Sequence, residues 1–285
     1  MDIAWTVSGG RALGPAPFFI CGIVNVTPDS FYDGGRHAST QAAEAHARAL
    51  ASQGAHILDV GGESSRPFAD PVSPEEEQAR VVPVVRALAA DASFRTPLSV
   101  DTYHAATAVA ALEAGAVIIN DISACAFDPA LIDVLTQYKP GYVLMHSQGR
   151  PEVMQQAPTY RDVVSEVRAF FEDKLAMLVK AGLPEDRIVL DPGIGFGKLL
   201  EHNLALLRHV DVFAALGRPV MAALSNKSMF QGLLGLAPGD RVNATQAATA
   251  VLASRGVRIH RVHEVALALE AVTVGMALAQ DWVRT

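Results

Sequence analysis

The sequence predicts an α/β protein in which eight strand–helix units close into a (β/α)8, or TIM, barrel. Three observations predict this fold class: a length of 285 residues, a composition that is half apolar, and short apolar runs that alternate with longer amphipathic stretches. An open, doubly wound sheet is the alternative, but it would have to arrange eight similar strands between two layers of helices. The pattern contains no obvious linker, so we expect residues 1–285 to form a single domain.

Eight short runs rich in Val, Ile and Leu have the composition of parallel strands that are buried on both faces. They span Phe18–Val26, Ala55–Val60, Pro97–Asp101, Ala116–Asp121, Gly141–His146, Arg187–Asp191, Pro219–Ser225 and Gly256–His263. Most are separated by Ala-rich stretches with helical periodicity, for which we predict helices. Examples are Thr40–Gln53, Ser73–Ala90, Tyr103–Ala114, Tyr160–Ala181 and Asn243–Ser254.

Local signals mark the ends of several predicted elements. Gly54, Gly115 and Gly182 follow helical stretches, where a left-handed backbone favours glycine. Ser73-Pro74-Glu75-Glu76 supplies an N-cap, a proline in the first position and acidic side chains in the first turn. Near the N-terminus, Ser8-Gly9-Gly10 separates two short apolar runs. This pattern predicts an N-terminal β-hairpin that covers the barrel bottom.

The composition limits the classes of partner and compartment. The net charge of −7 argues against a nucleic-acid or anionic-membrane surface, although a few local cations could still hold a phosphorylated substrate. Cys21 and Cys125 are too few for a disulfide framework or a zinc site, so we expect packed free thiols. The N-terminus lacks the features of a secretory signal, and no apolar run approaches the roughly 20 residues that span a bilayer. We therefore expect a soluble cytoplasmic protein.

Polar side chains follow nearly every predicted strand. They are Asn25, Asp59, Asp101, Asn120, Asp121, His146, Asp191, Ser225 with Lys227, and Arg261 with His263. One such residue alone is as readily a helix cap or a turn residue as a ligand. The carboxyl ends of barrel strands converge on one mouth, however, so the repeated pattern predicts a functional site there.

Two of these segments carry further chemical information. Asp191–Lys198 is rich in glycine but has neither the spacing of a phosphate-binding P-loop nor that of a dinucleotide-binding loop. It would let a flat ligand approach the backbone. Arg261 and His263 lie two apart on a strand and therefore share a face, a pairing that suits a phosphate or diphosphate group. The alternative is surface charge at a strand end.

Taken together, the motifs resemble those of dihydropteroate synthases, in the family's order and from about Phe18 to the C-terminus. The matching segments are Asn25–Phe31 with Asp33-Gly34-Gly35, Asp59–Pro67, Ser99–Thr102, Asn120–Ile122, Met145-His146, Asp191–Lys198, Ser225–Ser228 and Arg261–His263. The resemblance implies that 4-aminobenzoate displaces diphosphate from 6-hydroxymethyl-7,8-dihydropterin diphosphate, which gives dihydropteroate for folate biosynthesis. It also implies a Mg²⁺ cofactor, competition by sulfonamides and a homodimer.

The resemblance also implies roles for individual residues. The positions that contact the pterin in the family correspond here to Asp101, Asn120, Ile122, Met145, Asp191, Phe196 and Lys227. Diphosphate contacts match Asn25, Arg261 and His263, with Asn25 also at the position of the Mg²⁺ ligand. Contacts with 4-aminobenzoate match Thr27, Phe31, Ser65, Arg66, Pro67, Phe196 and Ser225. The catalytic positions are Asp101, Asp191, Lys227, Arg261 and His263.

The chain departs from the family pattern at three positions. Asn226 stands where the family usually has Arg, Ser65 where it has Thr, and Glu264 where it has Asp. Asn226 removes a permanent positive charge beside the predicted site. Two alternative functions share the pterin pocket: a methyltetrahydrofolate-dependent methyltransferase, which needs a corrinoid partner and no diphosphate site, and a non-catalytic pterin-binding paralogue.

Overall fold

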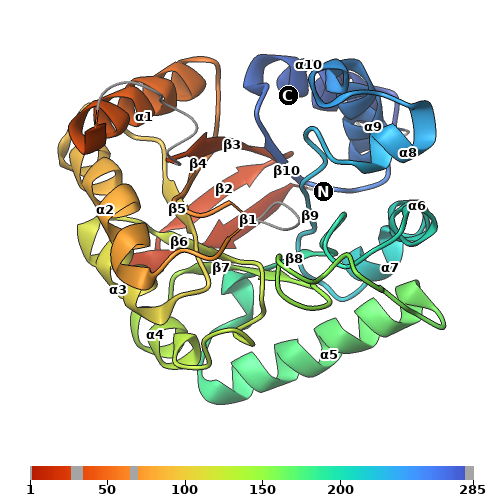
Figure 1. Cartoon of the computed structure of the whole chain (residues 1–285), viewed down its shortest axis with the longest axis horizontal. Coiled ribbons are helices and arrows are strands. Elements are labelled where there is room, and N and C mark those ends of the chain that lie inside the picture. Colours follow the sequence, from red (N-terminus) through yellow and green to blue (C-terminus); the bar gives the residue numbers. More distant parts are fainter. Residues whose placement is uncertain (1, 27–34, 65–69, 280–285) are drawn as a thin grey trace.

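The computed structural model describes residues 2–26, 35–64 and 70–279, and within that part of the chain eight parallel strands surround one axis and carry helices on their outer side (Figure 1). The strands are β3 (Phe19–Asn25), β4 (Ile57–Gly61), β5 (Leu98–Asp101), β6 (Ile118–Asp121), β7 (Gly141–Met145), β8 (Ile188–Asp191), β9 (Met221–Ala222) and β10 (Ile259–Val262). The α/β fold class predicted from the sequence is confirmed.

The sheet closes on itself, which distinguishes a barrel from an open doubly wound sheet. Neighbouring strands run in the order β8-β7-β6-β5-β4-β3-β10-β9. A parallel bridge between Leu190 and Val220 joins the two ends, and the Leu190 N–H donates to the carbonyl of Pro219 at 2.9 Å. Strand β9 is shorter than the predicted strand Pro219–Ser225. The chain turns after it, and the carbonyl of Leu224 accepts the N–H of Lys227.

Helices follow the strands around the barrel. They are α1 (Gly35–Ser52), α2 (Pro74–Ala90), α3 (Ala105–Ala114), α4 (Leu131–Tyr138), α5 (Val163–Ala181), α6 (Leu200–Arg208), α7 (Asp211–Ala214), α8 (Met229–Leu234), α9 (Val242–Ser254) and α10 (Val265–Ala277). The predicted boundary signals act as expected. Ser73 caps α2 by accepting the N–H of Glu76, while Gly115 and Gly182 end α3 and α5 with φ angles of 117° and 115°.

The two faces of the strands bury different side chains, because successive residues of a strand point to opposite sides. Outward-facing residues such as Val24, Leu58 and Ile119 pack against the helices. Inward-facing residues fill the lower barrel; they are Phe19, Cys21, Ile57, Ile118, Val143, Val189, Met221 and Ile259. Each strand therefore contributes side chains both to the layer between barrel and helices and to the barrel interior. Residues two positions beyond the lower inward-facing ones face the upper interior.

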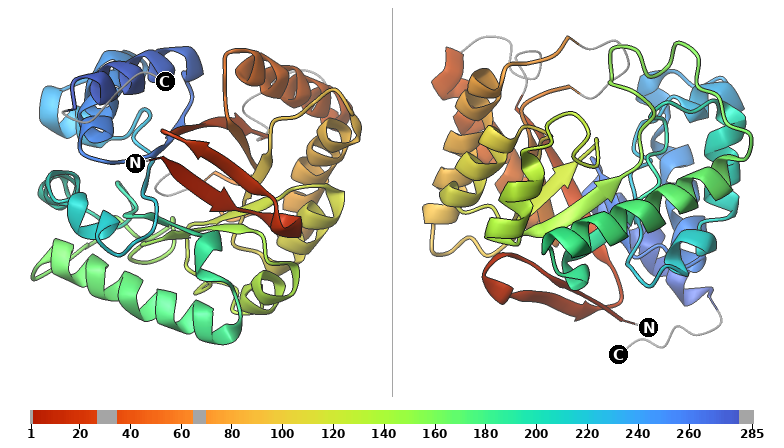
Figure 2. Two further views of the ribbon diagram at one scale, coloured as in Figure 1. Left: turned by 180° about the vertical axis from the view of Figure 1, so that it is seen from behind. Right: turned by 90° about the horizontal axis from the view of Figure 1, so that it is seen from below.

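An N-terminal hairpin covers the lower end of the barrel, as predicted (Figure 2, left). Strands β1 (Ile3–Thr6) and β2 (Ala12–Ala16) pair antiparallel around the turn Ser8–Gly10. Trp5 is 1% exposed and packs among the inward-facing apolar residues, while its indole N–H donates to the carbonyl of Arg187 at 2.7 Å. The Arg187 side chain in turn donates to the Val7 carbonyl at 2.6 Å. The hairpin thus acts as a plug.

Both cysteines are free and buried, as expected from the sequence. Cys21 belongs to the inner apolar layer, whereas Cys125 lies beside the Tyr142 hydroxyl. Among the described helices, none combines the length and the apolar character needed to cross a bilayer.

Replacing Trp5 by Ala should lower the free energy of unfolding by about 3–5 kcal/mol, because a large buried side chain and its hydrogen bond are both lost. Urea denaturation followed by circular dichroism measures this change. Val179→Ala, at a position that is 43% exposed on α5, is the control and should change stability by no more than about 0.5 kcal/mol. A loss below about 1 kcal/mol for Trp5→Ala would contradict the role of the hairpin as a plug.

Candidate active site

The upper interior of the barrel is polar, in contrast to the apolar layer below it. Across β3 to β6, Asn25 is in register with Gly61, Gly61 with Asp101, and Asp101 with Asn120. Arg261 lies two residues beyond the inward-facing Ile259 on β10 and shares its face. Alternation along the strands therefore brings polar groups from distant parts of the sequence to one mouth.

A buried cluster of opposite charges links four of these strands. The Arg261 Nε–H donates to Asp59 Oδ2 at 2.7 Å, and an Nη2–H donates to Asp101 Oδ2 at 2.7 Å. The amide of Asn120 donates to the same Asp59 oxygen at 2.8 Å. Asp59 is 1% exposed, whereas Asp101 and Arg261 retain some contact with solvent. The structure thus brings Asp101, Asn120 and Arg261 together.

Burial and charge act in opposite directions on these groups. Desolvation raises the pKa of Asp101 to about 7, although the nearby Arg261 favours the ionised form. For Arg261, burial alone would lower the pKa, but the carboxylates of Asp59 and Asp101 outweigh it and raise the pKa. The guanidinium therefore stays charged, while burial makes the ionised form of Asp101 less favourable than it is in water.

Asp191 and Lys227 form a second polar group at the mouth. Asp191 Oδ1 accepts the N–H of Gly193 at 2.7 Å, and burial raises its pKa. The Lys227 ammonium lies 4.2 Å from the centre of the Phe196 ring, a cation–π distance. Although part of Lys227 reaches solvent, desolvation lowers its pKa to about 8, against the opposing effect of Asp191.

The loop after β8 is fixed by residues behind it. The Lys198 ammonium bonds with His146 Nδ1 at 3.0 Å and donates to the carbonyl of Phe196 at 2.9 Å. Burial lowers the pKa of Lys198 to about 7 and, with Lys198 close by, that of His146 to about 3. A Cβ at Gly193 would lie 1.9 Å from the His146 carbonyl oxygen, so this close approach requires glycine. Lys198 and His146 therefore support the loop that carries Phe196.

An apolar cluster lies next to the charged groups. It contains Ile122, Met145 and Phe196, three residues expected from the sequence to contact a pterin, together with Tyr103 and Met154. The sequence gives no sign that Tyr103 and Met154 belong here, because aromatic and apolar residues outside the strand ends carry no signal of their own. The cluster supplies a flat apolar wall beside hydrogen-bonding groups.

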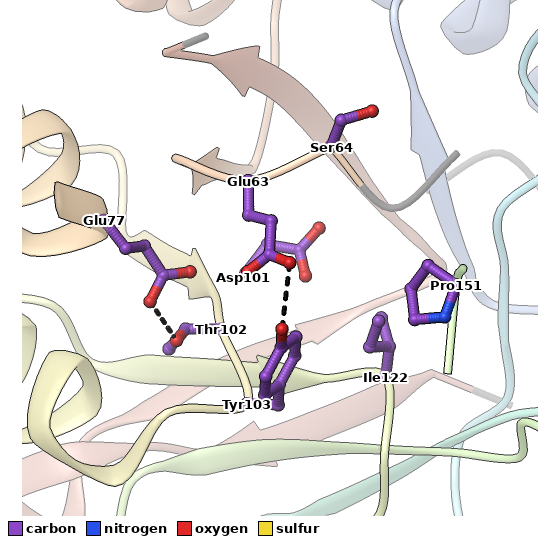
Figure 3. Close-up of a pocket in the computed structure, with 8 residues that line it drawn as sticks. All are labelled: Glu63, Ser64, Glu77, Asp101, Thr102, Tyr103, Ile122 and Pro151. Carbon is purple, nitrogen blue, oxygen red and sulfur yellow. Dashed lines mark hydrogen bonds between the residues drawn. The ribbon is translucent and has the colours of Figure 1, made fainter. Parts of the chain in front are cut away.

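A pocket opens beside Asp101, between the ends of β4, β5 and β6 and the loop after β7 (Figure 3). Its lining residues are Glu63, Ser64, Glu77, Asp101, Thr102, Tyr103, Ile122 and Pro151. Tyr103 donates to Glu63 Oε1 at 2.9 Å, and Thr102 donates to Glu77 Oε2 at 2.7 Å. Glu77 was not expected here, since an acidic residue in the first turn of a helix is usually explained by its favourable interaction with the helix dipole.

Ser225 and His263 meet at the other side of the mouth, with Ser225 Oγ 2.9 Å from His263 Nδ1. The adjacent Asn226 has a φ of 59°, a left-handed conformation that asparagine tolerates, and its carbonyl accepts from the buried Arg241 at 2.9 Å. Asn25, half-buried at the end of β3, also belongs to the mouth. Thr27, Phe31, Ser65, Arg66 and Pro67 lie outside the described residues.

Asp121 does not belong to this group, although the sequence placed it there. It follows the inward-facing Asn120 and therefore points to the helix side of β6. Its carboxylate accepts from the Cys125 N–H at 2.6 Å, from the Tyr142 hydroxyl at 2.8 Å and from the Ser123 N–H at 2.7 Å. Asp121 holds the turn after β6 in place.

Comparison with known proteins places the chain in a family. The model of a family described as "Pterin binding enzyme" matches residues 21–263. The chain belongs to the pterin-binding enzyme family. The dihydropteroate synthase of Escherichia coli K12 is 42% identical to it over 265 residues, which cover 93% of each chain. The resemblance noted in the sequence is confirmed.

Solved structures of family members have the same fold. A Yersinia pestis dihydropteroate synthase, in a sulfonamide drug complex, superposes with a TM-score of 0.89 at 40% identity and covers 96% of this chain and 98% of its own. The Xanthomonas albilineans enzyme with 4-aminobenzoic acid superposes with a TM-score of 0.89 at 41% identity, covering 98% and 99%. The same enzyme in complex with 7,8-dihydropteroate gives 0.86 at 40% identity, again covering 98% and 99%.

The two lysines of this pterin-binding enzyme should titrate far below the ordinary lysine pKa of 10.5. We expect Lys227 to lose its proton near pH 8 and Lys198 near pH 7 in ε-¹³C-lysine NMR spectra. Lys→Arg variants assign the two signals. Asp191→Asn should move both titrations to lower pH, because the Asp191 carboxylate favours both ammonium forms. Titration of Lys227 near pH 10 would contradict the desolvated environment.

Proposed function

We propose that this pterin-binding enzyme is a dihydropteroate synthase, which condenses 6-hydroxymethyl-7,8-dihydropterin diphosphate with 4-aminobenzoate and releases diphosphate. The observation that carries the proposal is the convergence of distant polar side chains on one barrel mouth beside an apolar wall. These side chains are Asp59, Asp101, Asn120, Asp191, Lys227 and Arg261. The synthase relatives support this activity over a methyltransferase or a non-catalytic paralogue.

The polar groups have the chemistry that a pterin edge requires. A pterin presents ring and amino N–H donors next to ring nitrogen and carbonyl acceptors. Asp101 and Asp191 would accept from the donors, whereas Asn120 and Lys227 would donate to the acceptors. The apolar cluster of Ile122, Met145 and Phe196 would contact the faces of the ring. An analogue without the hydrogen-bonding edge would leave buried polar groups unpaired and should bind poorly.

The diphosphate would lie on the side of Arg261, His263 and Asn25. Asn25 ends β3 at the level of the mouth, and its amide oxygen is a hard ligand of the kind that Mg²⁺ accepts together with substrate phosphates and water. The bound ion would neutralise charge on the diphosphate. Arg261 is the permanent cation of this site, and His263 would add a hydrogen bond, with Ser225 holding its ring.

These residues suit a dissociative displacement. Arg261 and His263 would stabilise the negative charge that grows on diphosphate as the C–O bond breaks. The carboxylates of Asp101 and Asp191 would stabilise the positive charge left on the pterin methylene group. The aniline nitrogen of 4-aminobenzoate would then attack and lose its proton after bonding, so the reaction needs no strong general base.

The second substrate would lie beside Phe196 and Ser225, with contributions from Thr27, Phe31, Ser65, Arg66 and Pro67. The complex of the Xanthomonas albilineans enzyme with 4-aminobenzoic acid supports a site for this substrate, and the Yersinia pestis complex supports competition by sulfonamides. We further infer that the chain works as one domain and as a homodimer in the cytoplasm. Exposed apolar residues on α9 and α10, such as Val251 and Val274, support an interface, and the two buried free thiols fit a reducing compartment.

The purified protein should release diphosphate from 6-hydroxymethyl-7,8-dihydropterin diphosphate only when Mg²⁺ and 4-aminobenzoate are both present. A coupled diphosphate assay, with dihydropteroate identified by mass spectrometry, measures both products. Addition of a chelator serves as the control for the metal. Failure to form dihydropteroate from authentic substrates would reject the proposed activity.

Lys227→Ala should reduce kcat/KM for the pterin substrate roughly 100-fold or more, because a preorganised cationic donor is removed from the mouth. The melting temperature should change little, since Lys227 is partly exposed. Lys180→Ala, at an exposed position near the end of α5, is the matched control and should keep full activity. A near-normal rate for Lys227→Ala would show that its role is misassigned.

A further inference from the structure

We propose that Asp59 is a positioning residue for both halves of the pterin substrate, an inference that rests on the proposed function. A single oxygen, Asp59 Oδ2, accepts hydrogen bonds from the Asn120 amide at 2.8 Å and from Arg261 Nε–H at 2.7 Å. Asn120 would contact the pterin ring, and Arg261 would contact the diphosphate. Asp59 therefore fixes the relative positions of two groups that bind opposite ends of one molecule.

The position of Asp59 in the barrel suits this role. It lies on β4, two residues beyond the inward-facing Ile57, and is in register with Ile23 and Ser99. Asp101 is in register with Gly61, two residues further up β4. Asp59 thus sits one inward-facing position below the level of Asp101. With 1% of its surface exposed, it acts from beneath the side chains that it holds.

Asp59 gives Arg261 a hydrogen bond that pterin binding at Asp101 need not disturb. The Arg261 guanidinium is held by two carboxylates, since its Nη2–H also donates to Asp101 at 2.7 Å. A pterin N–H that bonds Asp101 Oδ2 would compete with the bond from Arg261 to the same oxygen. The Nε–H bond with Asp59 remains possible, because it uses a different nitrogen and a buried partner. Asp59 would keep Arg261 beside the diphosphate while Asp101 changes partners.

The bond pattern also orients the guanidinium. A hydrogen bond through Nε uses the inner edge of the planar group and leaves the Nη donors to bond other acceptors. Where Asp101 does not hold Nη2, these donors can form the paired hydrogen bonds that phosphate oxygens accept. A lysine at position 261 would lack this arrangement, since its ammonium cannot bond Asp59 and present a planar pair of donors at the same time.

Asp59→Asn tests the role of the carboxylate, because it keeps the shape but loses the charge and places an amide donor beside Arg261 or Asn120. We expect kcat/KM for the pterin substrate to fall about 10- to 100-fold, as is typical of small misplacements of binding groups. Isothermal titration should show weaker binding of two separate probes: 6-hydroxymethyl-7,8-dihydropterin, which reports on Asn120, and Mg²⁺-diphosphate, which reports on Arg261.

Asp121→Asn is the matched control. Asp121 is an equally buried carboxylate on the neighbouring part of the barrel, but its bonds hold backbone on the helix side of β6. Its substitution should lower the melting temperature and leave the affinities for both probes within about twofold of the wild type. Equal losses of affinity in both variants would show that Asp59 acts only through general stability and would overturn the proposal.

A double-mutant cycle tests whether Asp59 acts through Arg261. If it does, the losses in Mg²⁺-diphosphate affinity caused by Asp59→Asn and Arg261→Lys should be much less than multiplicative when the changes are combined. Fully multiplicative losses would overturn the proposal. If the wild type itself forms no dihydropteroate, the proposed function fails; if the wild type is active and Asp59→Asn retains normal kinetics and affinities, only the role of Asp59 fails.

A measurement on the wild type keeps the proposal testable if Asp59→Asn does not fold. The Arg261 Nε–H signal in ¹⁵N NMR, assigned by its loss in Arg261→Lys, should be protected from exchange without ligand. It should remain protected when Mg²⁺-diphosphate and 6-hydroxymethyl-7,8-dihydropterin are added. Loss of protection on addition of these ligands would show that Arg261 leaves Asp59, and the positioning role would be wrong.

Discussion

The two-residue repeat of the barrel strands is the constraint on which the rest of the structure depends. On β6, Ile118 and Asn120 face the interior, whereas Ile119 and Asp121 face the helices. The same alternation on β10 puts Ile259 in the apolar layer and Arg261 at the mouth. A shift of one residue in either strand would exchange the interior residues with those that pack against helices.

The charged cluster around Arg261 is tolerated inside this barrel because groups of opposite charge contact one another. An unpaired guanidinium would be costly to bury, but Arg261 has two carboxylates within hydrogen-bonding distance. Lys198 and His146 avoid the cost of burying charge in another way. Desolvation lowers the pKa values of both side chains, so the pair can be buried without two full charges. The charged groups of the mouth thus hold one another in position.

Much of the fold could be predicted from the sequence, since strand runs, glycine stops and the Ser73 cap are local signals. The mouth could be predicted in outline, because polar residues recur where strands end. The side-chain contacts within the mouth could not be predicted. Nothing local shows that Asn120 and Arg261 share one oxygen of Asp59, a contact between residues separated by up to 202 positions. Glu77 and Met154 were missed because they lie in a helix and a loop, where acidic and apolar residues usually have other roles.

The N-terminal hairpin also bears on how the chain is made. Its apolar side packs against residues that include Met221 and Ile259, which are synthesised more than 200 residues after Trp5. An isolated two-stranded hairpin is marginally stable in water. During translation, the hairpin therefore cannot complete its packing until Ile259 has been synthesised. The barrel must close around a hairpin whose last contacts are made only after more than 200 further residues have been added.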